Sequence, residues 1–309
     1  MTSREIRAAD RAKKASAHTE VLFSIDGGDS LRRVIVFHHI QKTAGTAMRN
    51  LIRANLRPYE RSVGKAKSLK DQSSEALLAW HREYYESLPP ERRNQMLAVM
   101  SHCANYMLPV IDDRAVLAIT LLRDPVDRIV SQYYMRANNH GKPLEAAGVE
   151  LPDFYKRRND ATIGDIYASL GGRSPADSPL AFRYSRFFNG QSRSLLDPHY
   201  DTRDLLYSQG PPEDADVWRE RLFTLVSDRY RVGLQERFDE FVASLGKQLG
   251  WKVLRARVRG KVTSNRPRLH EIDPGIVASM RAYNWLDDEL HAHCRAQAKP
   301  RRFGMLSRS

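Results

Sequence analysis

The stretch that most constrains the fold is VIVFHHIQKTAGTAM, which runs from Val34 to Met48. Its first half is apolar and rich in β-branched residues, as is typical of a strand buried on both faces of a parallel sheet. From Thr46 its second half spaces apolar residues at helical intervals, as far as Leu56 and before Pro58. A strand, a short polar turn and a helix follow one another here. Such a turn directs backbone N–H groups and the positive end of a helix dipole toward one point.

Units of this kind recur along the chain. Apolar runs predict further strands, and helical spacing of apolar residues predicts further helices. The strands are expected at residues 97–101, 115–122 and 230–234, and the helices at residues 46–56, 74–88, 126–137, 236–249 and 274–298. The alternation predicts an α/β fold of the P-loop-like, three-layer kind, with a central, mostly parallel sheet flanked by helices.

The composition favours a soluble protein of the reducing cytoplasm. Cys103 and Cys294 are the only cysteines, so neither a disulfide framework nor a zinc site is expected. No apolar run approaches the roughly 20 residues of a membrane span, and the charged N-terminus shows no secretory signal. The net charge is +13, and residues 251–269 hold several Lys and Arg but no acid. Such a run attracts nucleic acid, acidic glycan, lipid headgroups or a nucleotide, although a solvated basic face has the same pattern.

The turn of the first unit carries groups that suit a phosphate. Gly45 lets the backbone approach an anion without a Cβ atom in the way. Lys42 adds a positive charge, and Thr43 and Thr46 add hydroxyl donors. A Walker A loop has its lysine and Ser/Thr last, after two spaced glycines, whereas here the lysine comes first and one glycine is present. We therefore expect a shorter loop that holds a single phosphate; the alternative is an ordinary turn with Lys42 in solvent.

This order resembles the 5′-phosphosulfate loop of sulfotransferases that use 3′-phosphoadenosine 5′-phosphosulfate (PAPS). The carbohydrate type, including heparan-sulfate 2-O-type and bacterial members, typically has F-x-H-I-P-K-T-A-G-T-[TS]. The matching residues are Phe37, His39, Ile40, Lys42, Thr43, Ala44, Gly45 and Thr46. Gln41 replaces the usual proline and is expected to loosen the turn, and Ala47 replaces a usual hydroxyl. The resemblance implies that Lys42 stabilises the leaving phosphate and that the loop from Thr43 to Thr46 holds the 5′-phosphate.

A second stretch, LLRDPVDRIVSQYYMR from Leu121 to Arg136, is similar to the same family's 3′-phosphate element. That element is a strand ending in R-D-P-x-x-R before a helix with a serine, and its arginine can present a two-pronged fork to a phosphate. The resemblance assigns Arg123 and Ser131 to the 3′-phosphate. The alternatives are an ion pair between Arg123 and a neighbouring acid, and a Ser131 hydroxyl that faces solvent. Arg128 is more ambiguous, because a role in a structural ion pair is as well supported as any other role.

A third match begins at Tyr230, where YRVGLQERFDEFVASLGKQLGW resembles the family's x-V-G-x-x-E-R-F-D-E-S strand and helix. We interpret most of this pattern as core and helix ends. The segment TSNRPRLHEIDPGIVASMRAYNWLDDEL, which starts at Thr263, resembles the approach to the family's last helix. The resemblance suggests that Asn265 and Arg266 close over the 3′-phosphoadenosine end of the nucleotide.

An acceptor hydroxyl should lose its proton to a general base with a pKa near neutrality, and histidine is the natural choice. In relatives of the carbohydrate type, a histidine follows the strand between the two phosphate elements. His102 has that place here and is the candidate base. The alternative is a partly buried histidine bonded to backbone. No carboxylate motif suggests Mg²⁺, so no metal is expected.

Together these matches predict a cytoplasmic, PAPS-dependent sulfotransferase that modifies a hydroxyl of a carbohydrate or glycolipid by in-line displacement. We expect a single domain over residues 1–309, with residues 1–30 as a frayed or helical lead-in. Residues 138–228 match the family poorly and are expected to form an insertion that shapes the acceptor site.

The sequence leaves two other hypotheses open. One is a nucleotide kinase with an atypical P-loop. The other is a basic module that grips nucleic acid or acidic glycan without catalysis. No nucleic-acid-binding motif is visible in the sequence, so a nucleic-acid partner is not expected.

Overall fold

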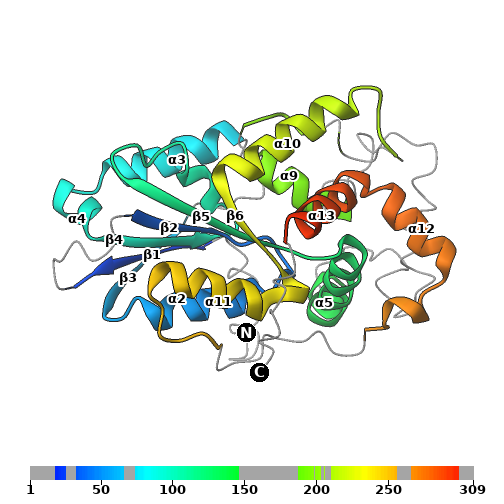
Figure 1. Cartoon of the computed structure of the whole chain (residues 1–309), viewed down its shortest axis with the longest axis horizontal. Coiled ribbons are helices and arrows are strands. Elements are labelled where there is room, and N and C mark those ends of the chain that lie inside the picture. Colours follow the sequence, from blue (N-terminus) through cyan, green and yellow to red (C-terminus); the bar gives the residue numbers. More distant parts are fainter. Residues whose placement is uncertain are drawn as a thin grey trace, which may run out of the picture.

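The computed structural model describes residues 18–25, 33–65, 74–145, 187–197, 199–202, 205, 210–255 and 266–298. Its centre is a six-stranded sheet with the strand order β3-β1-β4-β2-β5-β6 (Figure 1). The strands are β1 (His18–Ser24), β2 (Arg33–His38), β3 (Tyr59–Lys65), β4 (Met96–Ser101), β5 (Ala115–Leu122) and β6 (Tyr230–Leu234). β2 is parallel to β4 and β5, and β5 is parallel to β6, whereas β1 is antiparallel to β3 and β4. The sheet is mostly parallel, as expected, with an antiparallel edge.

Helices lie on both faces and at one end of this sheet (Figure 1). The α-helices are α2 (Gly45–Asn55), α3 (Ser74–Glu86), α4 (Pro90–Asn94), α5 (Pro125–Glu145), α9 (Gly190–Leu196), α10 (Ala215–Arg229), α11 (Phe238–Leu249), α12 (Pro274–Ala282) and α13 (Trp285–Gln297). Short 3-10 helices are η1 (Ala104–Met107), η5 (Gln235–Arg237) and η6 (Leu269–Glu271).

β2 lies in the middle of the parallel part of the sheet. Val36 pairs with Val99 of β4 on one side and with Ala118 of β5 on the other. Every residue of β2 after Arg33 is buried, which explains its run of apolar, β-branched residues. Because parallel strands end at the same edge, the residues that follow β2, β4 and β5 meet at the carboxyl edge of the sheet.

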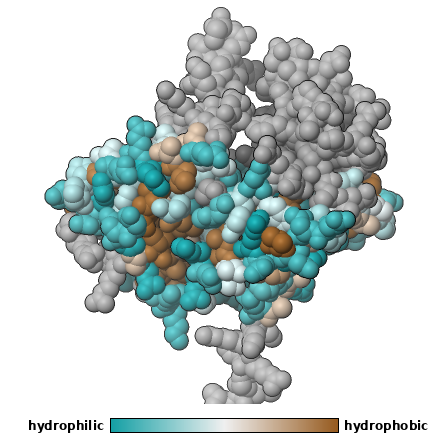
Figure 2. Space-filling view, turned by 90° about the horizontal axis from the view of Figure 1, so that it is seen from above, coloured by the Kyte–Doolittle hydropathy of each residue, from teal (hydrophilic) through white to brown (hydrophobic). Residues whose placement is uncertain are grey.

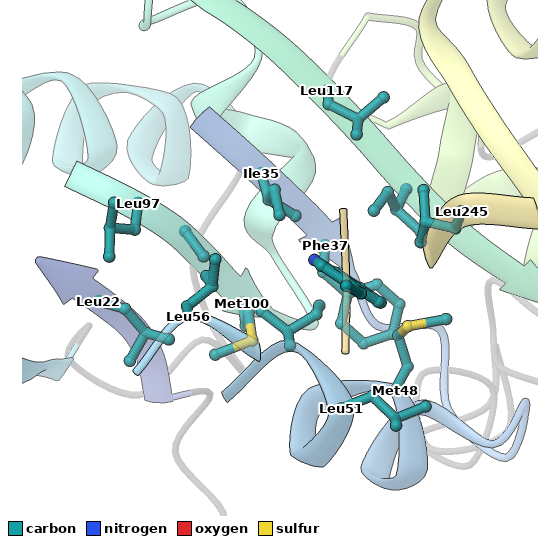
Figure 3. Packing of buried hydrophobic residues seen from close by; sticks show 14 of the residues in the cluster. Leu22, Ile35, Phe37, Met48, Leu51, Leu56, Leu97, Met100, Leu117 and Leu245 are labelled. Atoms are coloured by element: carbon teal, nitrogen blue, oxygen red, sulfur yellow. The ribbon is translucent and has the colours of Figure 1, made fainter. Parts of the chain in front are cut away.

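One face of the sheet is covered by α2 and α11. Figure 3 shows the core on this side, where Ile35 and Phe37 of β2 share a buried cluster with Met48 and Leu51 of α2 and Leu245 of α11. This core holds the helix that leaves the loop against the strand that enters it. The loop between β2 and α2 therefore has a rigid support at each end.

Two separate groups of helices cover the opposite face of the sheet. Over β1, β2 and β4, Tyr85 of α3 and Met107 of η1 belong to the buried cluster. Over β5 and β6, residues of α9, α10 and α13 form another cluster, which includes Trp218 and Leu290. Helices on both faces give the three layers that the sequence predicts (Figure 1). Beyond the carboxyl edge, Ile129 of α5 shares a separate cluster with Met280 of α12, so α5 stands beside the strand ends.

β1 lies within the expected lead-in at residues 1–30, where the hydrophobic pattern predicts no strand; the lead-in prediction is wrong for these residues. The reason is Glu20, a fully buried acid in the middle of β1. It accepts hydrogen bonds from Arg49 and Arg53 of α2 and lies 3.2 Å from Arg61 of β3. Although burial raises the pKa of the Glu20 carboxyl, the hydrogen bonds and charges of Arg53 and Arg49 hold it below its ordinary value. A hydrophobic pattern does not show that arginines neutralise a buried acid, so it does not reveal this strand.

The single helix expected at residues 274–298 is instead two helices, α12 and α13. The chain turns at Asn284, which is fully buried. Its Nδ2 donates to the Met280 carbonyl at 2.8 Å, and its Oδ1 accepts the backbone N–H of Asn189 at 2.8 Å. The turn allows this long-range contact. The apolar spacing continues across the turn, so the pattern predicts a single helix.

Two other helices also differ from expectation. α5 continues to Glu145, beyond the expected end at residue 137. α10 has 15 residues and lies largely within residues 138–228, where no long helix is predicted. Its Trp218, Leu222 and Val226 are buried, so this part of the chain completes the core.

Hydrophilic residues cover most of the described surface above α3 and α10, with apolar residues gathered in patches between them (Figure 2). Among the described residues, the exposed large hydrophobic side chains are Ile25, Tyr200, Val217 and Leu254. In the part of the chain that the structure describes, every helix is too short or too polar to cross a membrane.

His81 of α3 provides a test of the core between α3 and η1. It is fully buried, its Nδ1 bonds the Leu77 carbonyl, and its ring lies 5.7 Å from that of Tyr106. Burial lowers the pKa of His81 to about 4. Since the unfolded imidazole has a pKa of about 6.5, the unfolded state binds the extra proton between these values.

We predict that the free energy of unfolding falls as the pH drops from about 6.5 toward 4, because His81 stays neutral only in the folded state. His81→Gln should reduce this slope by about 1.4 kcal/mol per pH unit. Urea unfolding at several pH values measures both slopes. His270→Gln, at a side chain that is 72% exposed, is the control and should leave the slope unchanged. Equal slopes for wild type and His81→Gln would contradict the prediction.

Candidate functional site

The loop between β2 and α2 has an uncommon backbone conformation. Lys42 has φ 69° and Ala44 has φ 65°, both in the left-handed region that favours glycine. Such a conformation costs about 1 to 3 kcal/mol per residue, so the surrounding structure must enforce the turn. Ala47 and Met48 donate their N–H groups to the Ala44 carbonyl. Within the described part of the chain, the N–H groups of residues 43–46 have no protein acceptor, so the first turn of α2 presents donors for an anion.

The two threonines of the loop differ in their environments. Thr43 is fully buried, and its Oγ1 donates to the Ile40 carbonyl at 2.8 Å, so the hydroxyl braces the turn from within. Thr46 is exposed on the first turn of α2. Of the two expected hydroxyl donors, Thr46 is therefore the accessible one, and Thr43 offers its backbone N–H.

The two departures from the family's loop have structural roles. Gln132 of α5, which is 1% exposed, donates through Nε2 to Gln41 Oε1 at 3.1 Å. This hydrogen bond anchors the loop to α5, whereas the sequence predicts a loosened turn. Ala47, in place of a hydroxyl, is buried. Its methyl group therefore belongs to the core side of α2.

Gly45 is required by a neighbouring side chain. A Cβ atom on Gly45 would lie 1.7 Å from Cδ2 and 2.0 Å from Nε2 of His39. The sequence suggests that this glycine admits an anion; in the structure, the His39 ring takes the space instead. The His39 ring lies 5.8 Å from that of Phe37 and 4.4 Å from that of His102. Glycine at this position thus allows a row of aromatic rings to run from the core to the loop.

Arg123, at the end of β5, reaches the same loop. Its Nη1 donates to the Lys42 carbonyl at 3.1 Å, and its side chain is 11% exposed. Gln191 of α9 fixes the backbone: it accepts the Arg123 N–H at 3.0 Å and donates to the Arg123 carbonyl at 2.9 Å. The structure therefore places Lys42 and Arg123 side by side.

Asp127, on the first turn of α5, pairs with two arginines. Arg123 donates to Oδ2 through Nε at 2.7 Å and through Nη2, and Arg266 donates to Oδ1 through Nη1 at 2.5 Å. The alternative expectation for Arg123, an ion pair with a neighbouring acid, is confirmed. Sequence reasoning did not identify Asp127, although its place four residues after Arg123 is a usable signal.

Lys42, Arg123 and Arg266 form a cationic cluster, in which the two arginines pair with the Asp127 carboxylate. Burial lowers the pKa of Lys42, and the charges of Arg123 and Arg266 lower it further. Burial also lowers the pKa of Arg123, against the opposing effect of Asp127. Positive charges that lower one another's pKa attract an anion, because a bound anion relieves their repulsion.

His102 follows β4 and is partly buried. Its Nδ1 bonds the His39 carbonyl oxygen. Since a carbonyl only accepts, Nδ1 carries a proton, and Nε2 is the basic nitrogen of the neutral ring. The alternative interpretation, a partly buried histidine bonded to backbone, is correct about its contacts. The same contact sets the tautomer that a general base requires.

His38 and His39 support the loop as neutral rings. Burial, followed by the charge of His102, lowers the pKa of His38 to about 3 and that of His39 well below its ordinary value. His38 Nε2 lies 3.0 Å from Ser194 Oγ of α9. Neither ring is suited to taking up a proton at neutral pH.

The structure places the other expected residues differently. Ser131 is 3% exposed on α5, so a solvent-facing hydroxyl is excluded. Arg128 is 2% exposed and lies 3.7 Å from Asp287, which confirms a structural ion pair. Arg266 joins the cationic cluster, and Asn265 lies outside the described residues.

A pocket of about 340 Å³ adjoins the cationic cluster. Its lining residues are Arg123, Asp124, Asp127, Leu234, Gln235, Glu236, Arg237, Leu269, His291 and Arg295. A larger, open hollow of about 580 Å³ lies on α3 and contains none of the expected site residues. Chemistry rather than volume therefore identifies the site. Among the described residues, no group of three His, Cys, Asp or Glu side chains could hold a metal ion.

A comparison with protein-family models matches residues 30–198 of the 309 to the sulfotransferase family. This segment contains the loop, His102, Arg123 and Ser131. The chain therefore belongs to the sulfotransferase family, whose members transfer sulfuryl groups. A search of curated proteins gave no match to this chain.

We predict that Gly45→Ala lowers the free energy of unfolding by about 1 to 3 kcal/mol, because the added methyl group must displace the His39 ring. Thr46→Ala, at the next and exposed position, should change it by no more than about 0.5 kcal/mol. Urea unfolding of both variants measures the difference. A Gly45→Ala protein as stable as the wild type would contradict the close contact between Gly45 and His39.

Proposed function

We propose that this chain transfers a sulfuryl group from PAPS to a hydroxyl of a carbohydrate or glycolipid. The observation that carries the proposal is the contact between Arg123 and Lys42, whose Nη1···O distance is 3.1 Å. Groups suited to two phosphates thereby come from two adjacent strand ends. One doubly phosphorylated nucleotide can reach both.

The loop is suited to the 5′-phosphosulfate. Its N–H groups at residues 43–46 have no acceptor among the described residues, and the helix dipole of α2 adds positive potential. The exposed Thr46 adds a hydroxyl donor. Lys42 supplies a full charge next to these donors.

We assign the 3′-phosphate end of the nucleotide to Arg123 and Arg266. Arg123 contacts the loop through the Lys42 carbonyl, and Arg266 is paired with Asp127 beside it. Arg266 comes from a segment distant in sequence, as expected for a residue that closes over a ligand. Ser131 and Asn265 remain predicted contacts. The adjoining pocket of about 340 Å³ has room for a nucleoside beside the cluster. Its lining by Leu234 and Leu269 offers apolar contact to an adenine ring.

The donor supplies an activated sulfuryl group, and the residues of this chain position it and balance its charge. The bond from sulfur to the bridging oxygen breaks, and a bond from sulfur to the acceptor oxygen forms. The electron pair stays on the leaving 5′-phosphate, where Lys42 stabilises the developing charge. The acceptor proton moves to His102 Nε2, since Nδ1 already carries a proton that it donates to the His39 carbonyl.

Family membership favours this transferase over a nucleotide kinase or a basic module without catalysis. The glycan or glycolipid acceptor and the cytoplasmic location remain predictions. Part of residues 138–228 lies outside the described residues, and their role in shaping the acceptor site within a single domain stays part of the proposal. Incubation with PAPS labelled in its sulfur, together with glycan and glycolipid fractions, would identify the acceptor.

We predict that the wild type binds adenosine 3′,5′-bisphosphate in isothermal titration. Lys42→Ala should fold normally and lose transfer by at least about 10²-fold, because Lys42 is the only Lys or Arg of the loop between β2 and α2 and carries its full positive charge. Lys247→Ala, which removes an exposed lysine of α11, is the matched control and should transfer normally. Unchanged transfer by Lys42→Ala would exclude the assigned role, and a folded wild type that does not bind the bisphosphate would exclude the donor.

A further inference from the structure

Asp127 is an unexpected residue in a site that binds polyanions. Both of its carboxylate oxygens are engaged by arginines, Oδ2 by Arg123 and Oδ1 by Arg266. These are the side chains to which the proposed function assigns the far phosphate of the nucleotide. The carboxylate is 25% exposed, so it borders the surface from which a ligand would enter.

Helix capping does not explain this acid. An acid on the first turn of a helix normally stabilises the helix N-terminus. In α5 Asp124 has this capping role, because its Oδ1 accepts the Asp127 N–H at 2.9 Å. Asp124 is paired with Arg281 at 3.0 Å rather than with the cationic cluster. Within the part of the chain that the structure describes, the Asp127 carboxylate therefore accepts hydrogen bonds from Arg123 and Arg266 alone.

Arg123 turns one edge of its guanidinium toward Asp127, through Nε and Nη2, and uses Nη1 for the Lys42 carbonyl. A two-pronged contact with a phosphate needs an edge with two parallel N–H groups. The guanidinium has a second such edge, Nη1 with Nη2, where Nη1 already donates to the Lys42 carbonyl. An incoming phosphate therefore competes with Asp127 at the first edge or with that carbonyl at the second. Arg266 is engaged by Asp127 through one donor, because its Nη1 is bound to the other carboxylate oxygen.

We propose that Asp127 competes with the 3′-phosphate of the donor for Arg123 and Arg266, and that it is thereby a specificity-determining residue of this sulfotransferase. The inference rests on the proposed function, because it assumes a 3′-phosphorylated donor. Asp127 holds the two arginines in position, and it repels any anion that approaches them. A phosphate dianion carries enough charge to displace the carboxylate, whereas a ligand without a 3′-phosphate leaves the ion pairs intact.

The test compares adenosine 3′,5′-bisphosphate with adenosine 5′-monophosphate, which lacks only the 3′-phosphate. Isothermal titration of the wild type and Asp127→Asn at one ionic strength gives four affinities. We expect Asp127→Asn to bind the bisphosphate about tenfold more tightly, because a like charge beside the phosphate is gone. The affinity for the monophosphate should change by no more than about twofold. Asp216→Asn, which removes an exposed acid paired with Arg219 on α10, is the matched control for net charge.

The outcomes separate this inference from the proposed function. If the wild type binds neither nucleotide, the donor assignment fails and the inference fails with it. If the wild type binds the bisphosphate but Asp127→Asn binds it equally or more weakly, Asp127 is a positioning residue only, and the inference alone is overturned. Equal gains for both nucleotides, or an equal gain in Asp216→Asn, would show a general effect of charge and would also overturn it.

A second variant covers the case in which Asp127→Asn does not fold. Arg266→Gln leaves the pair between Arg123 and Asp127 intact and changes a side chain that is 26% exposed. We expect this substitution to lower the affinity for the bisphosphate by about fivefold or more and to change the affinity for the monophosphate by no more than about twofold. Equal losses for both nucleotides, or no loss, would contradict exchange of Arg266 between Asp127 and the 3′-phosphate.

Discussion

The hydrogen bond from the Arg123 guanidinium to the Lys42 carbonyl joins two segments that are 81 positions apart in sequence. It is possible because β2 and β5 are adjacent parallel strands, with His38 in register with Thr120. Neighbouring strands lie about 4.8 Å apart, so the residues that leave their carboxyl ends begin next to each other. The cationic cluster, its carboxylate and the neighbouring pocket all depend on this pairing.

The loop keeps its left-handed residues because several unrelated contacts hold it. Thr43 closes it from within through the Ile40 carbonyl, and Gln132 of α5 ties down Gln41. The His39 ring fills the space beside Gly45. These contacts come from the loop itself, from α5 and from the residue that follows β2. We infer that they hold the N–H groups at the start of α2 in place without a ligand. Preorganisation of this kind is what electrostatic catalysis requires, since the donors need not reorient during the reaction.

Local patterns were enough to predict most of the strands and helices that bury an apolar face, although α10 was missed. The two phosphate motifs were enough to predict Lys42 and Arg123 as neighbours, and the resemblance placed Arg266 at the same nucleotide. What could not be predicted depends on contacts between distant residues. β1 is concealed by Glu20, whose charge is neutralised by arginines of α2 and β3. The break between α12 and α13 depends on Asn284 and its partner Asn189. The same reason explains why Asp127 was missed: its importance lies in Arg266, which is 139 positions away.

The most direct test of the account is a crystal structure of the wild type with adenosine 3′,5′-bisphosphate. We expect one phosphate within hydrogen-bonding distance of the N–H groups at residues 43–46 and of Lys42, and the other on the guanidinium of Arg123. A nucleotide bound elsewhere, or with a single phosphate held and the other in solvent, would contradict it.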